Sequence, residues 1–243
     1  MISKTTVKFI KSLQIKKLRQ KYEQFLVEGE KSIAELLKSH FEVIKILATK
    51  QWIEENRVIM HQFDIEEISE KELLEISSHQ SPQKVLAIVK IPNQIAEINS
   101  EQLVLGLDEI QDPGNLGTII RIADWYGISQ IICSKGCTDV YNPKCINATM
   151  GSFLRVKVAY QDLLQTAQNN QLPIIVATLE GNSIHGAKMP QNGLLIVGNE
   201  GHGIDPEIIK NADYNYFIPR FGKAESLNAA ISIAIILDNF KRQ

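Results

Sequence analysis

The sequence holds few of the residues that mark a disulfide-stapled, low-complexity or membrane-spanning protein. Only three of its 243 residues are cysteine, and it has 14 glycines and 8 prolines, which excludes a disulfide scaffold and a repetitive linker. No apolar run approaches the roughly 18 to 20 residues that span a bilayer, and the N-terminus lacks the apolar core of a secretory signal. We therefore expect a soluble cytoplasmic protein that does not bind a membrane.

Neither charge nor cysteine spacing identifies a partner for the chain as a whole. The 26 basic and 28 acidic residues leave a formal net charge of −2. Cys133, Cys137 and Cys145 match no zinc-binding pattern with neighbouring histidines, so we expect reduced thiols and no metal. With 44% hydrophobic residues, the chain can form one large or two ordinary domains.

The first 22 residues carry seven basic side chains and no acidic one. Val7, Ile10, Leu13 and Leu18 fall roughly at helical spacing, which predicts a helix with its lysines turned outward. Two interpretations stay open on charge alone. The lysines form a solvated helix face, or they contact the phosphates of a polyanion.

Strand and helix patterns alternate along the next seventy residues and predict a small α/β unit. The predicted strands cover residues 25–29, 41–49, 57–62 and 84–91, and the predicted helices cover 30–39, 51–56 and 68–77. Residues 92–100 contain proline, two asparagines and little periodicity, as a linker does. We expect a domain over residues 1–92, a linker over 93–102 and a second domain over 103–243.

The second domain opens with LVLGL (103–107), a continuous apolar run typical of a strand buried on both faces of a parallel sheet. Further strands are predicted over 129–134, 173–178, 193–198 and 214–219, and helices near 116–127, 161–169, 205–211 and 226–240. In open parallel sheets, ligands bind beyond the carboxyl ends of the strands. The loops that follow these strands are therefore the candidate site.

Two of these loops flank helix starts. In the first, Asn115 stands near a helix start after Pro113 and Gly114, and Arg121 follows. Alternatively, Asn115 only caps the helix and Arg121 pairs with a surface carboxylate such as Asp124. In the later loop, Ser226 and Asn228 precede an alanine-rich helix, and capping by Ser226 is the plain explanation.

The remaining loop, IVGNEGHGI (196–204), carries three glycines directly after an apolar strand. Glycine permits a close approach of backbone to a ligand. The loop lacks the G-x-G-x-x-G fingerprint of dinucleotide-binding folds and the Gly-Lys-Ser/Thr of a P-loop. An oxidoreductase with a nucleotide cofactor is therefore disfavoured.

These loops resemble the motifs of the SpoU (TrmH-type) branch of the SPOUT class of S-adenosylmethionine-dependent RNA ribose methyltransferases. The resemblance is carried, in the order and spacing of that branch, by DPGNLGTIIRIADWYG, IVGNEGHGI and IPRFGKAESLN. The stretch NPKCINATMGSFLRVKV (142–158) is also similar to that family, so the resemblance covers essentially all of residues 103–240.

The resemblance implies an α/β fold with a C-terminal parallel-sheet domain that contains a deep trefoil knot, and a homodimer. It implies methylation of a ribose 2′-hydroxyl, with Arg121 activating the hydroxyl and Asn115, Glu200, Ser226 and Asn228 in supporting roles. S-adenosylmethionine would be held by Thr178, Leu179, Gly198, Asn199, Gly203, Ile218, Pro219 and Leu227.

The N-terminal unit is similar to the family's accessory RNA-binding domain, whose fold resembles small ribosomal proteins. That similarity favours RNA contact by Lys11, Lys16, Lys17, Arg19 and Lys21. Arg220 stands where the family often has methionine, and it favours contact with RNA phosphate. We expect large-subunit ribosomal RNA as the substrate. A transfer RNA methyltransferase and a non-catalytic RNA-binding or ribosome-assembly protein remain the alternatives.

Overall fold

The computed structural model describes residues 2–59, 61–93 and 97–242. The contacts divide the chain into two units, residues 1–93 with 141–154, and residues 94–140 with 155–243. The second segment of the N-terminal unit lies inside the region that the sequence assigns to the C-terminal domain. Part of the expected linker, residues 94–96, lies outside the described residues.

The N-terminal unit is built on a small mixed sheet. The order is β1-β4-β2-β3, with β4 antiparallel to both neighbours and β3 parallel to β2. Its elements are α1 (Lys4–Ser12), α2 (Lys16–Tyr22), β1 (Gln24–Glu28), α3 (Glu30–Leu36), β2 (Val43–Ala48), α4 (Lys50–Glu55), η1 (Arg57–Ile59), β3 (Ile65–Glu67), α5 (Glu70–Ile76) and β4 (Val85–Lys90), followed after a long interval by α7 (Pro143–Thr149) and η2 (Ser152–Leu154). The predicted strand over 57–62 is wrong, because residues 57–59 form a 3₁₀ turn and the strand lies at β3.

Alternating side chains of this sheet supply two apolar cores, one on each face. On β1, Leu26 packs with the core that includes Ile10 of α1 and Leu73 of α5. Phe25 and Val27 point to the other face, which α3 covers.

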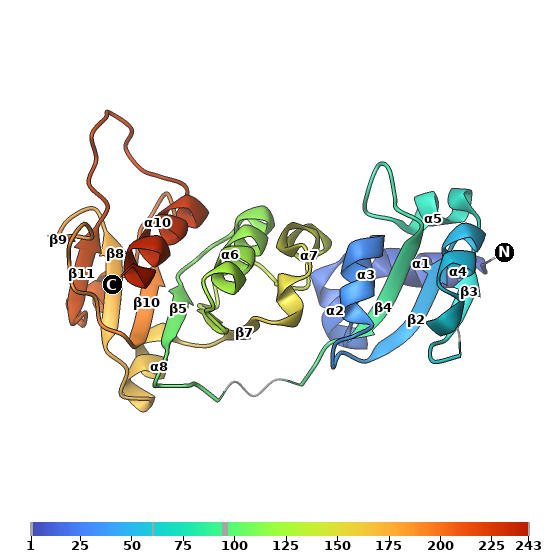
Figure 1. Cartoon of the computed structure of the whole chain (residues 1–243), viewed down its shortest axis with the longest axis horizontal. Helices are drawn as coiled ribbons and strands as arrows, with labels where there is room; N and C mark the ends of the chain where they lie inside the picture. Colours follow the sequence, from blue (N-terminus) through green and yellow to red (C-terminus); the bar gives the residue numbers. More distant parts are fainter. Residues whose placement is uncertain (1, 60, 94–96, 243) are drawn as a thin grey trace. The chain divides into compact units, whose positions relative to one another are not determined.

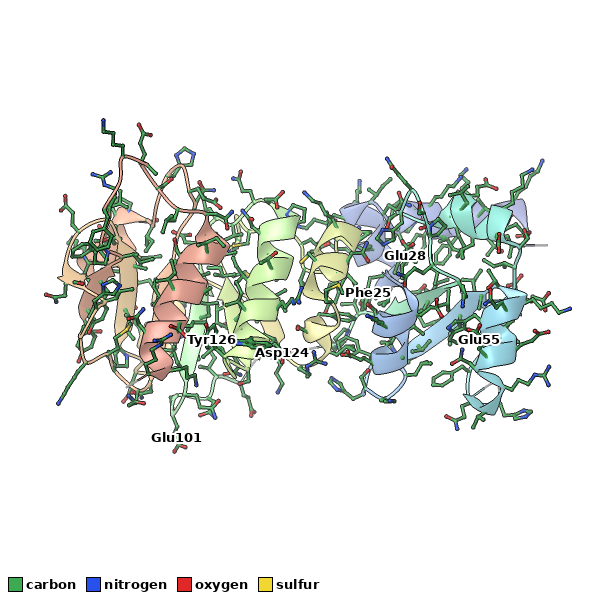
Figure 2. All side chains as sticks on the ribbon, turned by 45° about the horizontal axis from the view of Figure 1, so that its top comes forward. Phe25, Glu28, Glu55, Glu101, Asp124 and Tyr126 are labelled. Carbon is green, nitrogen blue, oxygen red and sulfur yellow. The ribbon has the colours of Figure 1, made fainter. Side chains whose placement is uncertain are left out.

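The segment Tyr141–Leu154 completes the second of these cores. Phe25, labelled in Figure 2, belongs to this core. Its ring centroid lies 4.5 Å from that of Tyr141 and 6.0 Å from that of Phe153. Ile146 of α7 is buried in the same cluster. The N-terminal unit is therefore discontinuous in sequence, which alternation along its first ninety residues could not reveal.

The C-terminal unit contains a seven-stranded parallel sheet with the order β7-β6-β5-β10-β8-β11-β9, as the apolar run at β5 predicts (Figure 1). The elements are β5 (Leu103–Leu107), α6 (Pro113–Trp125), β6 (Gln130–Cys133), β7 (Lys157–Tyr160), α8 (Leu163–Asn169), β8 (Ile174–Thr178), β9 (Asn182–Ser183), β10 (Gly193–Val197), α9 (Pro206–Lys210), β11 (Tyr214–Phe217) and α10 (Ala229–Lys241). The sequence patterns miss the edge strands β7 and β9. The implied knot stays a prediction.

Helices cover both faces of this sheet. Val104, Val176 and Ile196 pack against α8 and α9. Helices α6 and α10 contact each other and lie side by side over the sheet (Figure 1). Since the strands are parallel, the loops after β5, β8, β10 and β11 all leave from one edge, as a ligand site in such a sheet requires. None of the described helices is both long and apolar enough to cross a membrane.

A capping box at the start of α5 makes the stability of the N-terminal unit depend on pH. The Ser69 side chain accepts the backbone N–H of Glu72, and the Glu72 carboxylate accepts the N–H groups of Ser69 and Ile2. Hydrogen bonds from the Ser69 backbone and side chain are the main causes that lower the pKa of Glu72 to about 2.

Replacing Glu72 by alanine is expected to lower the urea midpoint of unfolding at neutral pH. A carboxylate with a depressed pKa stabilises the fold above its ordinary pKa of 4.5, and that contribution is lost as the pH falls toward 2. The difference between wild type and Glu72→Ala should thus shrink below pH 4.5. Glu70→Ala, in the same helical turn, is the matched control. A difference that does not vary with pH would contradict this role.

Candidate functional site

The loop after β10 folds back on itself through its glycines. Asn199 and Gly203 form an antiparallel pair, with N···O distances of 3.0 and 2.9 Å, and the Asn199 side-chain oxygen accepts the N–H of Gly201 at 2.7 Å. A Cβ on Gly198 would lie 2.1 Å from the carbonyl oxygen of Gly203. Glycine is required at position 198 because two backbone segments touch there.

Glu200, at the turn of this loop, joins three segments that are distant in sequence. Its Oε1 accepts hydrogen bonds from Nδ2 of Asn115 at 2.8 Å, the backbone N–H of Ala229 at 3.2 Å and Nδ2 of Asn228 at 3.4 Å. Asn228 also donates to Oδ1 of Asn115 at 3.0 Å. We call Asn115, Glu200, Asn228 and Ala229 the Glu200 junction. It brings together three of the residues that the sequence predicts for the site.

The residues that cap α6 and α10 differ from the caps that the sequence suggests, Asn115 and Ser226. Asp112, not Asn115, caps α6, since its carboxylate accepts the N–H of Asn115 at 2.8 Å. Capping of α10 by Ser226 is wrong, because Asn228 accepts the N–H groups of Ala230 and Ile231. The Asn115 side chain is therefore free of capping and is available to the junction.

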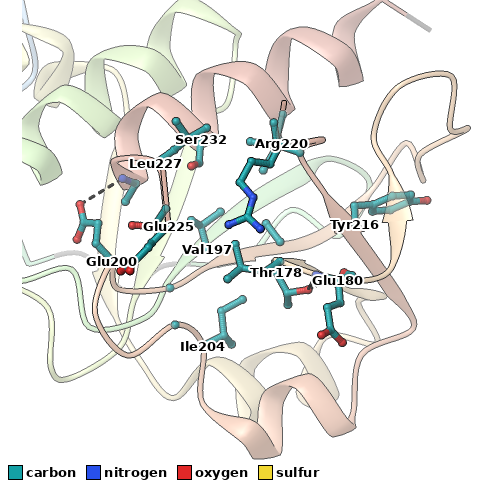
Figure 3. Close-up of a pocket in the computed structure, with 18 of the residues that line it drawn as sticks. Thr178, Glu180, Val197, Glu200, Ile204, Tyr216, Arg220, Glu225, Leu227 and Ser232 are labelled. Carbon is teal, nitrogen blue, oxygen red and sulfur yellow. Dashed lines mark hydrogen bonds between the residues drawn. The ribbon is translucent and has the colours of Figure 1, made fainter. Parts of the chain in front are cut away.

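A cavity of about 750 Å³ lies beside the junction, between the loops after β8, β10 and β11 and the start of α10 (Figure 3). All eight residues predicted to hold the cofactor line it, and so do Glu200, Ser226 and Arg220. The predicted cofactor residues among its lining are Thr178, Leu179, Gly198, Asn199, Gly203, Ile218, Pro219 and Leu227.

Arg220 is directed into this cavity. Its Nη1 donates to the carbonyl oxygen of Ala224 at 3.3 Å, and Figure 3 shows the guanidinium extending toward Val197 and Thr178. The cavity therefore holds a cationic group above an apolar wall.

Some lining residues were missed because they lie in a strand and not in a loop. Asn215, inside β11, has its side-chain oxygen 2.8 Å from the hydroxyl of Thr178. Burial, and to a smaller extent Tyr214, raise the pKa of the neighbouring Tyr216 phenol, which donates to the carbonyl of Lys188 at 3.2 Å. A polar Asn215 within an otherwise aromatic strand is the signal that could have indicated this wall.

Arg121 does not line the cavity. It is exposed on α6, six residues after Asn115. Asp124, the example of a surface partner for Arg121, pairs with Arg155 at 2.8 Å. Within a single chain, Arg121 therefore lies outside the cavity lining, whereas Glu200 and Ser226 are part of it.

The basic N-terminal segment divides into exposed and buried side chains. Lys16, Lys17 and Lys21 are exposed, and Lys11 forms a surface ion pair with Glu75 at 3.1 Å. The prediction that Arg19 contacts RNA is wrong, since its side chain is only 1% exposed and donates to the Leu13 carbonyl at 2.9 Å. Arg19 stabilises the connection between α1 and α2.

Among the residues with described coordinates, no group of three His, Cys, Asp or Glu side chains is placed to hold a metal ion. The three cysteines are buried within the fold and form no disulfide with one another.

Both halves of the chain match known families. Residues 102–238 match the SpoU rRNA Methylase family, and residues 4–87 match the MRM3-like substrate binding domain. The chain is 34% identical over 251 residues to the 23S rRNA (guanosine(2553)-2′-O)-methyltransferase RlmP of Bacillus subtilis, and the alignment covers 95% of this chain and 94% of that protein.

The structure also matches solved structures over the whole length of the chain. A TrmH-family protein from Porphyromonas gingivalis superimposes with a TM-score of 0.90 at 33% identity, and 100% of each chain is covered. The AdoMet-bound rRNA methyltransferase from Sinorhizobium meliloti gives a TM-score of 0.88 at 29% identity, with 100% of this chain and 97% of that one covered. The resemblance found in the three loops is confirmed: this chain belongs to the SpoU rRNA methylase family.

Proposed function

We propose that the protein transfers a methyl group from S-adenosylmethionine to a ribose 2′-hydroxyl of ribosomal RNA, with 23S rRNA as the substrate. The observation that carries the proposal is one cavity lined by all eight expected cofactor residues and tied by Glu200 to Asn115 and Asn228. The Bacillus subtilis relative is named for this reaction on 23S rRNA, which favours ribosomal over transfer RNA.

The cavity suits S-adenosylmethionine in size and in the character of its walls. Its volume of about 750 Å³ lies within the range of roughly 300–1,000 Å³ for small-molecule sites. Val197 and Ile218 offer an apolar surface to a flat base, and the backbone around Gly198 and Gly203 is accessible for polar contacts. When bound, the cofactor supplies the electrophilic methyl of its sulfonium.

Positioning of the ribose is the main task of the Glu200 junction, because methyl transfer needs the hydroxyl oxygen held in line with the methyl group. The carboxylate of Glu200, which lines the cavity, fixes the side-chain amides of Asn115 and Asn228 next to it. Ser226, on the cavity lining, shapes the space for the nucleotide.

We assign Arg121 to the target phosphate and the ribose oxygen. A guanidinium stays protonated in proteins, so it polarises the hydroxyl, whose proton leaves to phosphate or water as the C–O bond forms. Trp125, one helical turn beyond on the same face of α6, is 84% exposed. A second copy that covered Trp125 would also approach Arg121. We therefore propose a homodimer in which Arg121 of one copy serves the cavity of the other.

Residues 1–92 are proposed as the RNA substrate-binding domain, 93–102 as the linker and 103–243 as the catalytic domain with its knot, except that residues 141–154 belong to the N-terminal unit. The substrate-binding match over 4–87 supports the first boundary. The exposed Lys16, Lys17 and Lys21 would neutralise RNA phosphates. Lys11 remains available as well, because a surface ion pair contributes little.

The reaction is tested with labelled S-adenosylmethionine and unmodified 23S rRNA or transfer RNA, followed by nuclease digestion. We expect a 2′-O-methylnucleoside from 23S rRNA alone. Label in transfer RNA alone would give the transfer RNA alternative. Cofactor binding without transfer to either RNA would favour the non-catalytic protein.

Gly198→Ala is expected to weaken cofactor binding by at least about tenfold, which corresponds to a distortion of only about 1.4 kcal/mol. The new Cβ would lie 2.1 Å from the Gly203 oxygen and 2.3 Å from its carbonyl carbon, and neither backbone atom can turn away as a side chain would. Calorimetric titration measures the affinity, and thermal unfolding checks the fold. Unchanged affinity would place the cofactor elsewhere.

Arg121→Ala should lower kcat by about 10²- to 10⁴-fold, the usual loss on removing a group that assists proton transfer, with cofactor affinity little changed. Near-normal turnover by Arg121→Lys would rule out a special guanidinium role.

Mixing Arg121→Ala with Gly198→Ala tests whether two copies build each site. A hybrid dimer pairs one intact cavity with one intact arginine from the other chain, so the mixture should regain part of the activity that each variant lacks. No recovery, with subunit exchange verified, would place Arg121 in its own chain's site.

A further inference from the structure

An aromatic ring stands in solvent at the rim of the cavity. Phe221 lies in the loop between β11 and α10, which projects from the C-terminal unit (Figure 1). Its side chain is 92% exposed although the residue lines the cavity. A ring so exposed contributes almost nothing to the core, so folding alone does not explain it.

The loop holds this ring in a defined setting. Arg220, the preceding residue, donates to the carbonyl of Ala224 at 3.3 Å, which closes the backbone around Phe221 and Gly222. The space around Gly222 is open, because a Cβ added there would meet no atom within 4 Å apart from its two chain neighbours, and Phe221 itself is 92% exposed. The ring face is thus accessible from solvent while its backbone is tied at one point.

The charges around the ring fit a polyanion. Arg220 precedes Phe221, and the exposed Lys223 follows two residues later. Glu225 is the acidic residue of the same loop. Two cations that neighbour an accessible ring in the sequence match the combination with which proteins bind single-stranded nucleic acid, where aromatic faces stack on bases and cations contact phosphates.

We propose that Phe221 is a positioning residue that stacks on an unpaired base of the RNA substrate, beside the nucleotide whose ribose enters the cavity. This inference rests on the proposed function. Stacking uses the face of any base, so Phe221 adds affinity and fixes the approach of the strand without selecting a sequence. Arg220 then contacts the neighbouring phosphate from inside the cavity.

Three substitutions separate stacking from simple apolar contact. Phe221→Ala removes the ring, Phe221→Leu keeps an apolar side chain without a π-face, and Phe221→Trp enlarges the ring. Loss of stacking on one base typically weakens binding by about 5- to 150-fold. We expect Kd and KM for unmodified 23S rRNA to rise by that factor in Phe221→Ala and by most of it in Phe221→Leu. Phe221→Trp should bind RNA with at least the wild-type affinity, and RNA should quench the fluorescence of the added tryptophan.

Gln168→Ala is the control, because Gln168 is exposed on α8 of the C-terminal unit and does not line the cavity. It should leave Kd, KM and kcat unchanged. Kd for S-adenosylmethionine should be unaffected by all Phe221 variants. Weaker cofactor binding with normal RNA affinity would mean that Phe221 covers the cofactor, which would overturn the proposal. Equal RNA affinity of Phe221→Leu and the wild type would overturn it as well.

RNA affinity is measured without turnover, so the two proposals fail separately. Wild type that binds 23S rRNA through Phe221 but transfers no methyl group would contradict the proposed reaction alone. Wild type that methylates the RNA with no dependence on Phe221 would contradict the stacking role alone.

Discussion

One carboxylate oxygen holds the site together. Oε1 of Glu200 receives donors from the start of α6, 85 residues earlier in the chain, and from the start of α10, 28 residues later. The glycine loop that carries Glu200 can turn so tightly only because Gly198 and Gly203 meet without side chains between them. Loss of that turn would withdraw the carboxylate and release both helix starts from the cavity edge.

Much of this arrangement follows from the sequence. The apolar run at Leu103–Leu107 indicates a strand covered on both faces, and a parallel sheet then places its loops at one edge. Glycines after β10 and asparagines at two helix starts are visible as a pattern. The eight cavity residues were predicted as cofactor-binding from the resemblance of these loops to one family, more than from the chemistry of the side chains.

Other features depend on contacts that no local pattern records. Arg19 looks like its exposed lysine neighbours in sequence, yet the Leu13 carbonyl binds its guanidinium inside the fold. Ser226 is as good a cap as Asn228, and only the path of the loop decides where α10 begins. Arg121 belongs to the same motif as Asn115 but points to solvent, since six residues along a helix turn the side chain well away from the first position.

The discontinuous N-terminal unit has a consequence for how the protein is made. The ribosome delivers the sheet of residues 24–90 well before Tyr141–Leu154, so the apolar face around Phe25 lacks the cover of Tyr141 and Phe153 during that interval. An incomplete core of this kind exposes apolar side chains, which readily form non-native contacts. Between the synthesis of β5 and that of α7, the nascent chain therefore exposes an apolar surface to which chaperones can bind.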